Sequence, residues 1–136
     1  MDVTKTAIAS PDAPQAIGPY VPAQLVHLPG GGRLLFTAGQ VGIDPATGQI
    51  VSGGIRAETE RVGKNLGALL EAAGFTFADV VKTTVFLADM QDFAAMNEIY
   101  QQFFASAPPA RTTVQAAGLP RGARVEIEVV AIGRDA

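Results

Sequence analysis

Two glutamates near the end of the chain, Glu126 and Glu128, have the residue type and spacing to support acid–base chemistry. They alternate with three apolar residues in a predicted strand: Val125, Ile127 and Val129. Side chains along a strand point alternately to its two faces, so the carboxylates would share one face, with Cα atoms about 6–7 Å apart. A solvated strand surface is the ordinary explanation. A strand this apolar on its other face, however, usually lies inside a sheet, where carboxylates need partners or water.

Arg111 opens the predicted strand that precedes the glutamates, and we expect the two strands to be neighbours in the sheet. It follows the segment Pro108-Pro109-Ala110. A guanidinium group matches a carboxylate two hydrogen bonds at a time, so Arg111 could bind a carboxylate ligand. A surface arginine, or an arginine paired with a glutamate, is the alternative, and spacing alone favours it.

Three further polar residues stand at identifiable positions. Tyr20 ends the run Ile17-Gly18-Pro19-Tyr20, where its ring could pack or its hydroxyl could serve a site. Asn97 lies within a predicted helix, which asparagine disfavours, so a side-chain role is indicated, although a surface position is commoner. His27 ends a predicted strand, and we expect it to be structural or exposed.

Composition excludes several kinds of site. The chain has no cysteine, so disulfides, thiolate nucleophiles and cysteine-ligated metals are excluded. The run Gly30-Gly31-Gly32 lacks the Lys-Ser/Thr of a phosphate-binding loop, and the zinc-deaminase signature is absent. The sequence therefore offers no cysteine-based metal site, no phosphate-binding loop and no zinc-deaminase site.

Charge and hydropathy bear on partners and location. The net charge of −3 argues against a nucleic-acid partner, because a phosphate backbone is bound by basic surfaces. No apolar run approaches the roughly 20 residues of a membrane span. Residues 1–5 lack the charged and apolar regions of a signal peptide. The sequence therefore predicts a cytoplasmic protein that binds neither nucleic acid nor a membrane.

The length of 136 residues predicts a single domain over residues 1–136, with residues 1–16 as an irregular lead-in. Hydrophobic residues make up 48% of the chain, which is enough for one core. The segments with the composition of strands are 20–28, 33–40, 49–51 (short), 80–87, 111–116 and 124–132. Helical periodicity marks residues 57–73 and a second helix that runs from Asp92, a candidate N-cap, to about Phe104.

Each predicted helix has one apolar face. In the first helix this face consists of Val62, Leu66, Leu69, Leu70 and Ala73, and three glutamates lie off it: Glu58, Glu60 and Glu71. In the second helix it consists of Phe93, Met96, Tyr100 and Phe103. Gly74 ends the first helix, and Gly63 and Gly67 within it indicate close approach to a sheet.

The predicted order β-β-(β)-α-β-α-β-β is an α+β pattern, in which two helices pack on one face of a mixed sheet. Two amphipathic helices cover only that face. The other face must therefore be polar or be buried against partner chains.

The order and spacing of these motifs resemble the RidA/YjgF family from about Ala13 to Ile132. The matching stretches are Ile17–Tyr20, Leu35–Gln40, Asp44–Gly48, Val80–Leu87, Asp92–Tyr100, Pro108–Arg111, Leu119–Ala123 and Val125–Glu128. The resemblance implies a chorismate-mutase-like fold and a homotrimer whose sheets form a central barrel. It also implies sites in the clefts between subunits.

The activity that the resemblance implies is a cofactor-independent deaminase. Its substrates would be reactive 2-imino acids and their enamine tautomers, such as 2-iminobutanoate and 2-iminopropanoate, and its products 2-keto acids and ammonia. By the same resemblance Arg111 would bind the substrate carboxylate and Glu126 would position or activate water.

Other site positions follow from the resemblance alone. Tyr20 and Asn97 match pocket positions, and Gly39 and Thr113 match positions whose backbone contacts the substrate. Many members have serine where this chain has Ala38 and cysteine where it has Thr113. Backbone contacts survive either change, whereas a hydroxyl contact from position 38 does not.

Three alternatives to general imine hydrolysis stay open. A non-catalytic trimer could bind small carboxylates or regulate a partner protein with the same cleft. Ribonuclease activity is disfavoured by the acidic charge and by the lack of a histidine-based acid–base pair. A deaminase dedicated to one catabolic pathway would share all these residues.

Overall fold

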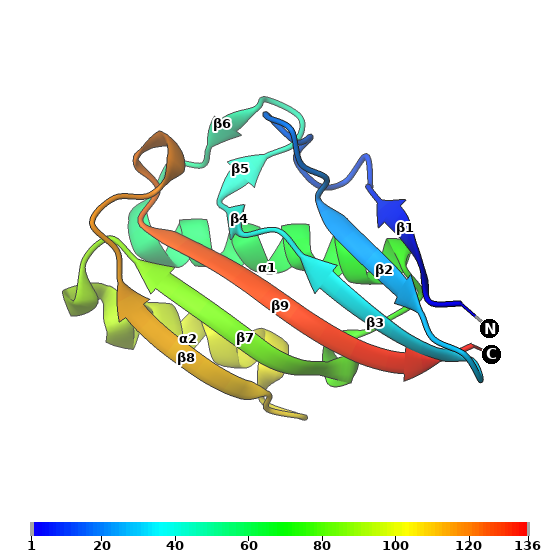
Figure 1. The fold of residues 1–136 in the computed structure, drawn as a ribbon. Helices are drawn as coiled ribbons and strands as arrows, with labels where there is room; N and C mark the ends of the chain where they lie inside the picture. Colours follow the sequence, from blue (N-terminus) through cyan, green and yellow to red (C-terminus); the bar gives the residue numbers. More distant parts are fainter. Residues whose placement is uncertain (1, 136) are drawn as a thin grey trace.

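Seven strands form one mixed sheet in the computed structural model, which describes residues 2–135 (Figure 1). The strands are β1 (Thr4–Ile8), β2 (Ala23–His27), β3 (Gly32–Thr37), β4 (Gln40–Val41), β7 (Val80–Leu87), β8 (Ala110–Gln115) and β9 (Val125–Arg134). They lie in the order β1-β2-β3-β9-β7-β8, with β4 also paired to β9. The pair β7–β8 is parallel, and the other pairs of this sheet are antiparallel.

Helices α1 (Gly54–Ala72) and α2 (Phe93–Phe104) lie on the same side of this sheet (Figure 1). A small hairpin of β5 (Ile43–Asp44) and β6 (Gln49–Ile50) precedes α1. Single 3₁₀ turns, η1 (Phe77–Asp79), η2 (Met90–Asp92) and η3 (Pro120–Gly122), join the larger elements. The predicted α+β class, with two helices on one face of a mixed sheet, is confirmed.

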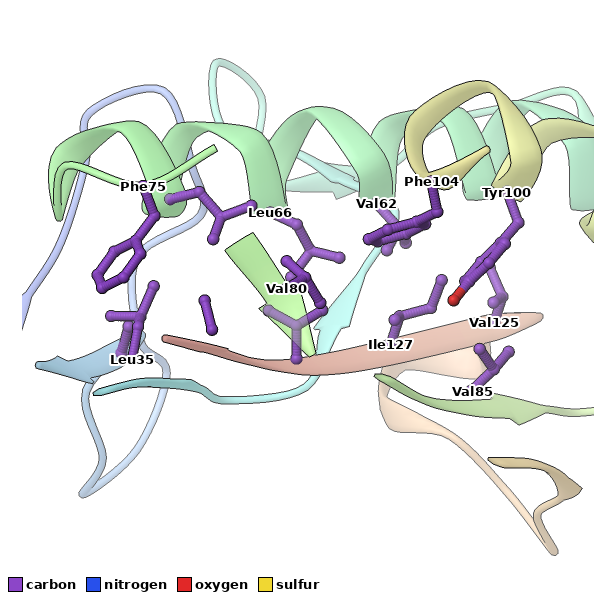
Figure 2. Packing of buried hydrophobic residues seen from close by; sticks show 14 of the residues in the cluster. Leu35, Val62, Leu66, Phe75, Val80, Val85, Tyr100, Phe104, Val125 and Ile127 are labelled. Carbon is purple, nitrogen blue, oxygen red and sulfur yellow. The ribbon is translucent and has the colours of Figure 1, made fainter. Parts of the chain in front are cut away.

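The core fills the space between the helices and the sheet. Figure 2 shows Val62 and Leu66 of α1 and Tyr100 and Phe104 of α2 above the strand residues Leu35, Val80, Val85, Val125 and Ile127. We call this side of the sheet the helix face. Val125, Ile127 and Val129 of β9 are buried there, as their alternation predicted.

In α2 the predicted apolar face is partly wrong. Met96 and Tyr100 are buried, but Phe93 is 36% exposed, whereas Phe104 is 3% exposed. Phe103 is half-buried and packs beside Gly63 of α1, where the two helices meet. The buried face of α2 therefore includes Phe104 in place of Phe93, because α2 packs against α1 as well as against the strands.

Several element boundaries differ from the prediction. Residues 4–8, expected to be irregular, form β1, because they pair with the whole length of β2. Helix α1 starts three residues earlier than predicted, at Gly54. Asp92 occupies the N-cap position of α2 without a side-chain cap bond, and the carboxylate of Asp89 instead accepts a bond from Gln91 N (2.9 Å) at η2.

The predicted strand over residues 33–40 is interrupted. β3 pairs with β9 as far as Phe36 opposite Val130, and β4 resumes the pairing with Gln40 opposite Ile127. At the interruption the Thr37 hydroxyl accepts the Val129 N–H (3.0 Å), which the missing ladder bond would leave unpaired. The intervening Ala38 and Gly39 are thus free to leave the ladder.

The second side of the sheet, which we call the open face, carries exposed apolar side chains. They include Phe36, Val114 and Ile132. Exposed apolar side chains gathered on one sheet face are typical of surfaces that another chain covers. Among residues 2–135, no helix combines the length and apolarity needed to span a bilayer.

The close contact of the helices predicts different effects of alanine at two glycines of α1. A Cβ atom at position 63 would overlap the Phe103 ring, whereas at position 67 the nearest atom, Phe77 Cε2, is 3.2 Å away. Alanine favours a helix interior over glycine by about 1 kcal/mol. We expect Gly63→Ala to lower the free energy of unfolding by about 1–3 kcal/mol through overpacking. Gly67→Ala should stay within about 1 kcal/mol of the parent.

Urea unfolding of both variants at one protein concentration measures this difference. A Gly63→Ala protein as stable as Gly67→Ala would contradict the packing described here.

Candidate active site

Glu126 projects from β9 onto the open face, between Val41 of β4 and Phe86 of β7. The Gly39 backbone passes directly over its carboxylate. A Cβ atom on Gly39 would lie 2.7 Å from the Glu126 carboxyl carbon, which leaves no room for a side chain. Glycine is therefore required at position 39 as long as Glu126 keeps this position.

The Glu126 carboxylate is only half-exposed, and its protonation reflects this. Burial raises the pKa of Glu126 above its usual value, because the charged form loses hydration. The negative charge of Glu128, two residues further on the same face, raises this pKa again. A carboxylate whose pKa is shifted toward neutrality is a better proton acceptor than an ordinary surface glutamate.

A small recess, partly open to solvent, lies next to Glu126. Its wall is mainly apolar and includes Ile17, Val41, Ile43 and Pro120. Tyr20 also lines it and is 50% exposed, and its hydroxyl accepts a hydrogen bond from the Ile17 N–H (3.4 Å). The structure thus brings together three predicted site residues: Tyr20, Gly39 and Glu126.

Arg111 lies on the helix face of β8, where α2 holds it. Its Nη1 donates to Asn97 Oδ1 at 2.6 Å, so the mid-helix asparagine has the side-chain role that its position indicated. The guanidinium stacks over the ring of Tyr100 (4.7 Å to the centroid) and more loosely over Phe93 (5.3 Å). One N–H of its five is used by Asn97, which leaves donors for a ligand.

Tyr100 itself is fixed by a hydrogen bond between its hydroxyl and Thr83 Oγ1 (2.7 Å). Burial raises the pKa of Tyr100, and the Thr83 bond and the positive charge of Arg111 oppose the shift. The ring that supports Arg111 therefore stays neutral and in one place. A shallow recess lined by Asn97, Gln101, Phe104, Pro108 and Arg111 opens beside it.

Arg111 and Glu126 do not meet within one chain. The expectation that their strands are neighbours is wrong, because β7 lies between β8 and β9. In the register of the sheet, Thr83 of β7 is opposite Arg111, and Phe86 of β7 is opposite Glu126. Thr83 is on the helix face and Phe86 on the open face, so the two site residues point to opposite sides.

Topology explains this separation. The unit β7-α2-β8 makes a crossover to a parallel neighbour, which places β8 at the edge of the sheet. β9 then returns antiparallel along the other side of β7. The candidate site residues therefore fall into two groups, which we call the two candidate half-sites: Arg111 with Asn97, and Glu126 with Gly39 and Tyr20.

Of the remaining positions, Thr113 and Ala38 each lie near one candidate half-site. Thr113 is two residues beyond Arg111 on β8, and its buried Oγ1 has no hydrogen-bond partner within residues 2–135. Ala38 lines a shallow groove on the Tyr20 side, with Gln24 and Phe36. His27 lies outside both, and its Nε2 is 3.2 Å from Thr6 Oγ1, across the β1–β2 pair.

Sequence patterns missed one residue of the Glu126 recess, Arg121. It lines the recess and has a left-handed backbone (φ 57°), which is rare for a residue with a side chain. Its Nη1 donates to the Gly48 carbonyl (2.7 Å) in the β5–β6 turn. Its place between Pro120 and Gly122 in a turn was the available signal.

Two further polar residues near this recess, Glu58 and Asn65 of α1, are buried. Glu58 was predicted to lie off the apolar face of the helix, but it is 4% exposed. Its position four residues before Val62 was the signal, because residues four apart lie on one side of a helix. No group of three or more His, Asp or Glu side chains within residues 2–135 is arranged to hold a metal ion.

The chain resembles characterised proteins along nearly its whole length. The family described as Endoribonuclease L-PSP matches residues 10–133. The human protein named 2-iminobutanoate/2-iminopropanoate deaminase is 51% identical over 128 residues, which cover 94% of this chain and 90% of that protein.

Solved structures agree with the fold. The YjgF gene product of E. coli has a TM-score of 0.84 at 39% identity, covering 95% of this chain and 99% of that one. E. coli TdcF, solved with bound serine, has a TM-score of 0.84 at 37% identity, covering 94% and 98%. The chain therefore belongs to the Endoribonuclease L-PSP family, the RidA/YjgF family that its motifs resemble.

Proposed function

We propose that this protein is a deaminase that hydrolyses 2-imino acids and their enamine tautomers to 2-keto acids and ammonia. Relatives about half identical over most of the chain carry the name 2-iminobutanoate/2-iminopropanoate deaminase. The structural observation that carries the proposal is the half-buried Glu126 carboxylate under Gly39, beside an apolar recess. Such a carboxylate can activate water while the recess accepts a small apolar side chain.

In this mechanism Arg111 binds the carboxylate of the imino acid. Asn97 and the Tyr100 ring hold the guanidinium in one orientation, so its free N–H donors are fixed before substrate arrives. A bidentate Arg–carboxylate pair fixes direction as well as distance. The imine carbon is thereby placed at a defined point relative to the groups across the cleft.

Glu126 acts as the general base. Its carboxylate takes a proton from water as the water oxygen bonds to the imine carbon, and the Glu126 carboxyl returns this proton to the nitrogen as the C=N electron pair shifts onto it. The resulting carbinolamine expels ammonia and leaves a C=O bond, so the balance is imine plus water to ketone plus ammonia. A positioned general base contributes about 10²–10⁴-fold.

A second copy of the chain would complete the site. Because Arg111 and Glu126 point to opposite faces of one sheet, a single chain cannot present both to one small substrate. We propose a homotrimer in which Arg111, Asn97 and Thr113 of one subunit face Tyr20, Gly39 and Glu126 of the next. Burial of the apolar open face would stabilise this assembly.

The ligand of a relative fits this substrate class. Serine, bound in E. coli TdcF, has a carboxylate and a nitrogen on the same carbon, as a 2-imino acid does.

The same cleft could bind carboxylates without catalysis, and Glu126→Gln separates the two functions because binding tolerates it and hydrolysis does not. The net charge of −3 disfavours RNA as substrate. The cytoplasmic location stays a prediction.

The hydrolysis itself can be measured in a coupled assay. A threonine dehydratase generates 2-iminobutanoate, and its disappearance is followed with and without the protein. We expect faster loss with the parent, and for Arg111→Ala a fall in kcat/KM of about 100-fold, since a charge-assisted pair is removed. Arg134→Ala, which removes an exposed arginine of β9, is the control. Unchanged imine decay with the parent would refute hydrolysis, and full activity of Arg111→Ala would refute its role.

Subunit mixing tests the shared site. Arg111→Ala and Glu126→Gln chains are each expected to be nearly inactive alone. When they are unfolded together in equal amounts and refolded, about a quarter of the sites in random trimers should regain both residues. Activity should therefore return in the mixture and in neither protein refolded alone. A mixture as inactive as its components would show that both residues act within one chain or not at all.

The raised pKa of Glu126 predicts that the ionised carboxylate, which activity requires, lowers the stability of the folded protein. As pH falls through this raised pKa, Glu126 becomes protonated and kcat should decrease. The folded state prefers the protonated form, so stability present below the unfolded pKa is lost as pH rises through the folded pKa. Glu126→Gln should thus be more stable than the parent at neutral pH, equal to it in strong acid, and inactive.

Glu128→Gln is the matched control for this effect. It should keep activity. The fall of kcat on the acidic side of its pH profile, which we call the acid limb, should move to lower pH, because Glu128 raises the pKa of Glu126. Thermal unfolding and kcat are measured between about pH 4, near the usual pKa of glutamate, and about pH 8. The two measurements report the effect on stability and the effect on activity. Equal stability of Glu126→Gln and the parent at every pH would contradict the assignment.

A further inference from the structure

Helix α1 places two buried polar side chains, Glu58 and Asn65, against the part of the sheet that surrounds Glu126. Glu58 is 4% exposed, and Asn65 is fully buried. They are seven residues apart, so they lie on the same side of the helix about 10 Å from each other along its axis. Buried polar side chains lower stability unless they are hydrogen-bonded, so the partners of this pair indicate its role.

Asn65 binds the backbone on both sides of Gly42. Its Nδ2 donates to the carbonyls of Val41 (3.2 Å) and Ile43 (3.0 Å), and its Oδ1 accepts from Arg61 Nε (3.0 Å). Gly42 itself lies against the helix, because a Cβ atom there would be 2.9 Å from Glu58 Cα. The short strand β4 is therefore held to α1 as well as to β9.

Glu58 holds the segment that leads into β9. Its Oε1 accepts the backbone N–H of Arg124 at 2.9 Å, and its Oε2 lies 3.6 Å from Arg124 Nε. Arg124 is two residues before Glu126. The backbone segments on either side of the Glu126 carboxylate are thus both attached to one rigid helix.

We propose that Glu58 and Asn65 are positioning residues for Glu126: they fix the start of β9 and strand β4, and so hold Gly39 over the carboxylate. β4 has only two residues in its ladder, Gln40 opposite Ile127 and Val41 opposite Glu126. Two ladder positions next to an interruption give weak restraint. The two hydrogen bonds from the buried Asn65 amide add to it by fixing the carbonyls of Val41 and, just past the strand, Ile43. Gly39 is two residues before Val41.

Loss of this attachment lets water reach the Glu126 carboxylate. Gly39 covers it from one side, and Phe86 lies opposite it on β7. Glu128 lies beside it on β9, and Tyr20 and Arg121 share its recess. Within residues 2–135 none of these groups shares a hydrogen bond or ion pair with Glu58 or Asn65, so the effect of the two residues on Glu126 passes through the backbone.

The test uses four variants in the full-length protein. Glu58→Leu removes the acceptor for Arg124 N, and Asn65→Ser removes the amide that holds β4. Glu58→Gln keeps an acceptor oxygen. Glu60→Gln removes the same charge from the exposed side of α1, where Glu60 pairs with Lys64 at 3.4 Å, and serves as the control.

We expect Glu58→Leu and Asn65→Ser to lower kcat by about tenfold or more, within the range that a general base contributes. KM should change by less than about threefold, because the carboxylate-binding Arg111 is held by Asn97 and Tyr100 of α2, and neither substitution touches these contacts. The acid limb of kcat should move to lower pH as Glu126 gains water. Glu58→Gln and Glu60→Gln should keep the parent kcat, KM and pH dependence of kcat.

The activity readout rests on the proposed function, so a second readout needs no substrate. Carbon-13 NMR titration of the Glu126 carboxyl should show its pKa nearer the usual glutamate value in Glu58→Leu and Asn65→Ser, and unchanged in Glu58→Gln. A parent without deaminase activity would refute the proposed function, while this titration would still decide the positioning role.

A purely structural role gives a different pattern. Folded Glu58→Leu and Asn65→Ser proteins with lowered Tm but parent kcat, acid limb and Glu126 titration would overturn the proposal. A Glu58→Gln protein as impaired as Glu58→Leu would also overturn it. If Glu58→Leu does not fold, Asn65→Ser carries the same expected and contrary outcomes.

Discussion

The backbone between β3 and β4 crosses directly over the Glu126 carboxylate, and a side chain at residue 39 would displace that carboxylate. This contact requires the strand to break, because a continuous ladder would keep residue 39 level with the sheet. The Thr37 hydroxyl compensates the break by taking the Val129 N–H. The same crossing excludes part of the water from the carboxylate, which raises its pKa toward the range of a useful base.

The hold of helix α1 on this region follows from that crossing. A loop that leaves the ladder over a charged group needs restraint on each side, and the polar side chains of Glu58 and Asn65 supply it. Both are buried beside an otherwise apolar core, where a polar side chain is tolerated because its hydrogen-bonding groups are used. Stability and geometry at the site therefore depend on the same few contacts.

The order of strands separates the two halves of the site. The parallel pair β7–β8 places Arg111 at the sheet edge beside α2, and β9 carries Glu126 on the open face. Within the proposed trimer, each cleft would combine one half from each of two chains, and the apolar open face would be covered. Activity would then require assembly, because an isolated chain has no surface where both groups reach one small molecule.

Periodicity in the sequence was sufficient to predict the features that depend on a single helix or strand. The strand 80–87, the alternation of Val125, Ile127 and Val129, and the unusual mid-helix Asn97 were all predictable, because residue spacing sets which side chains share a face. Family resemblance added the site residues, which no spacing rule singles out. Tertiary structure alone decided that the Glu58 carboxylate accepts the Arg124 N–H, that β1 is a strand and that Arg111 and Glu126 diverge. These depend on which strands pair and how closely a helix approaches, and such long-range contacts leave no period in the sequence.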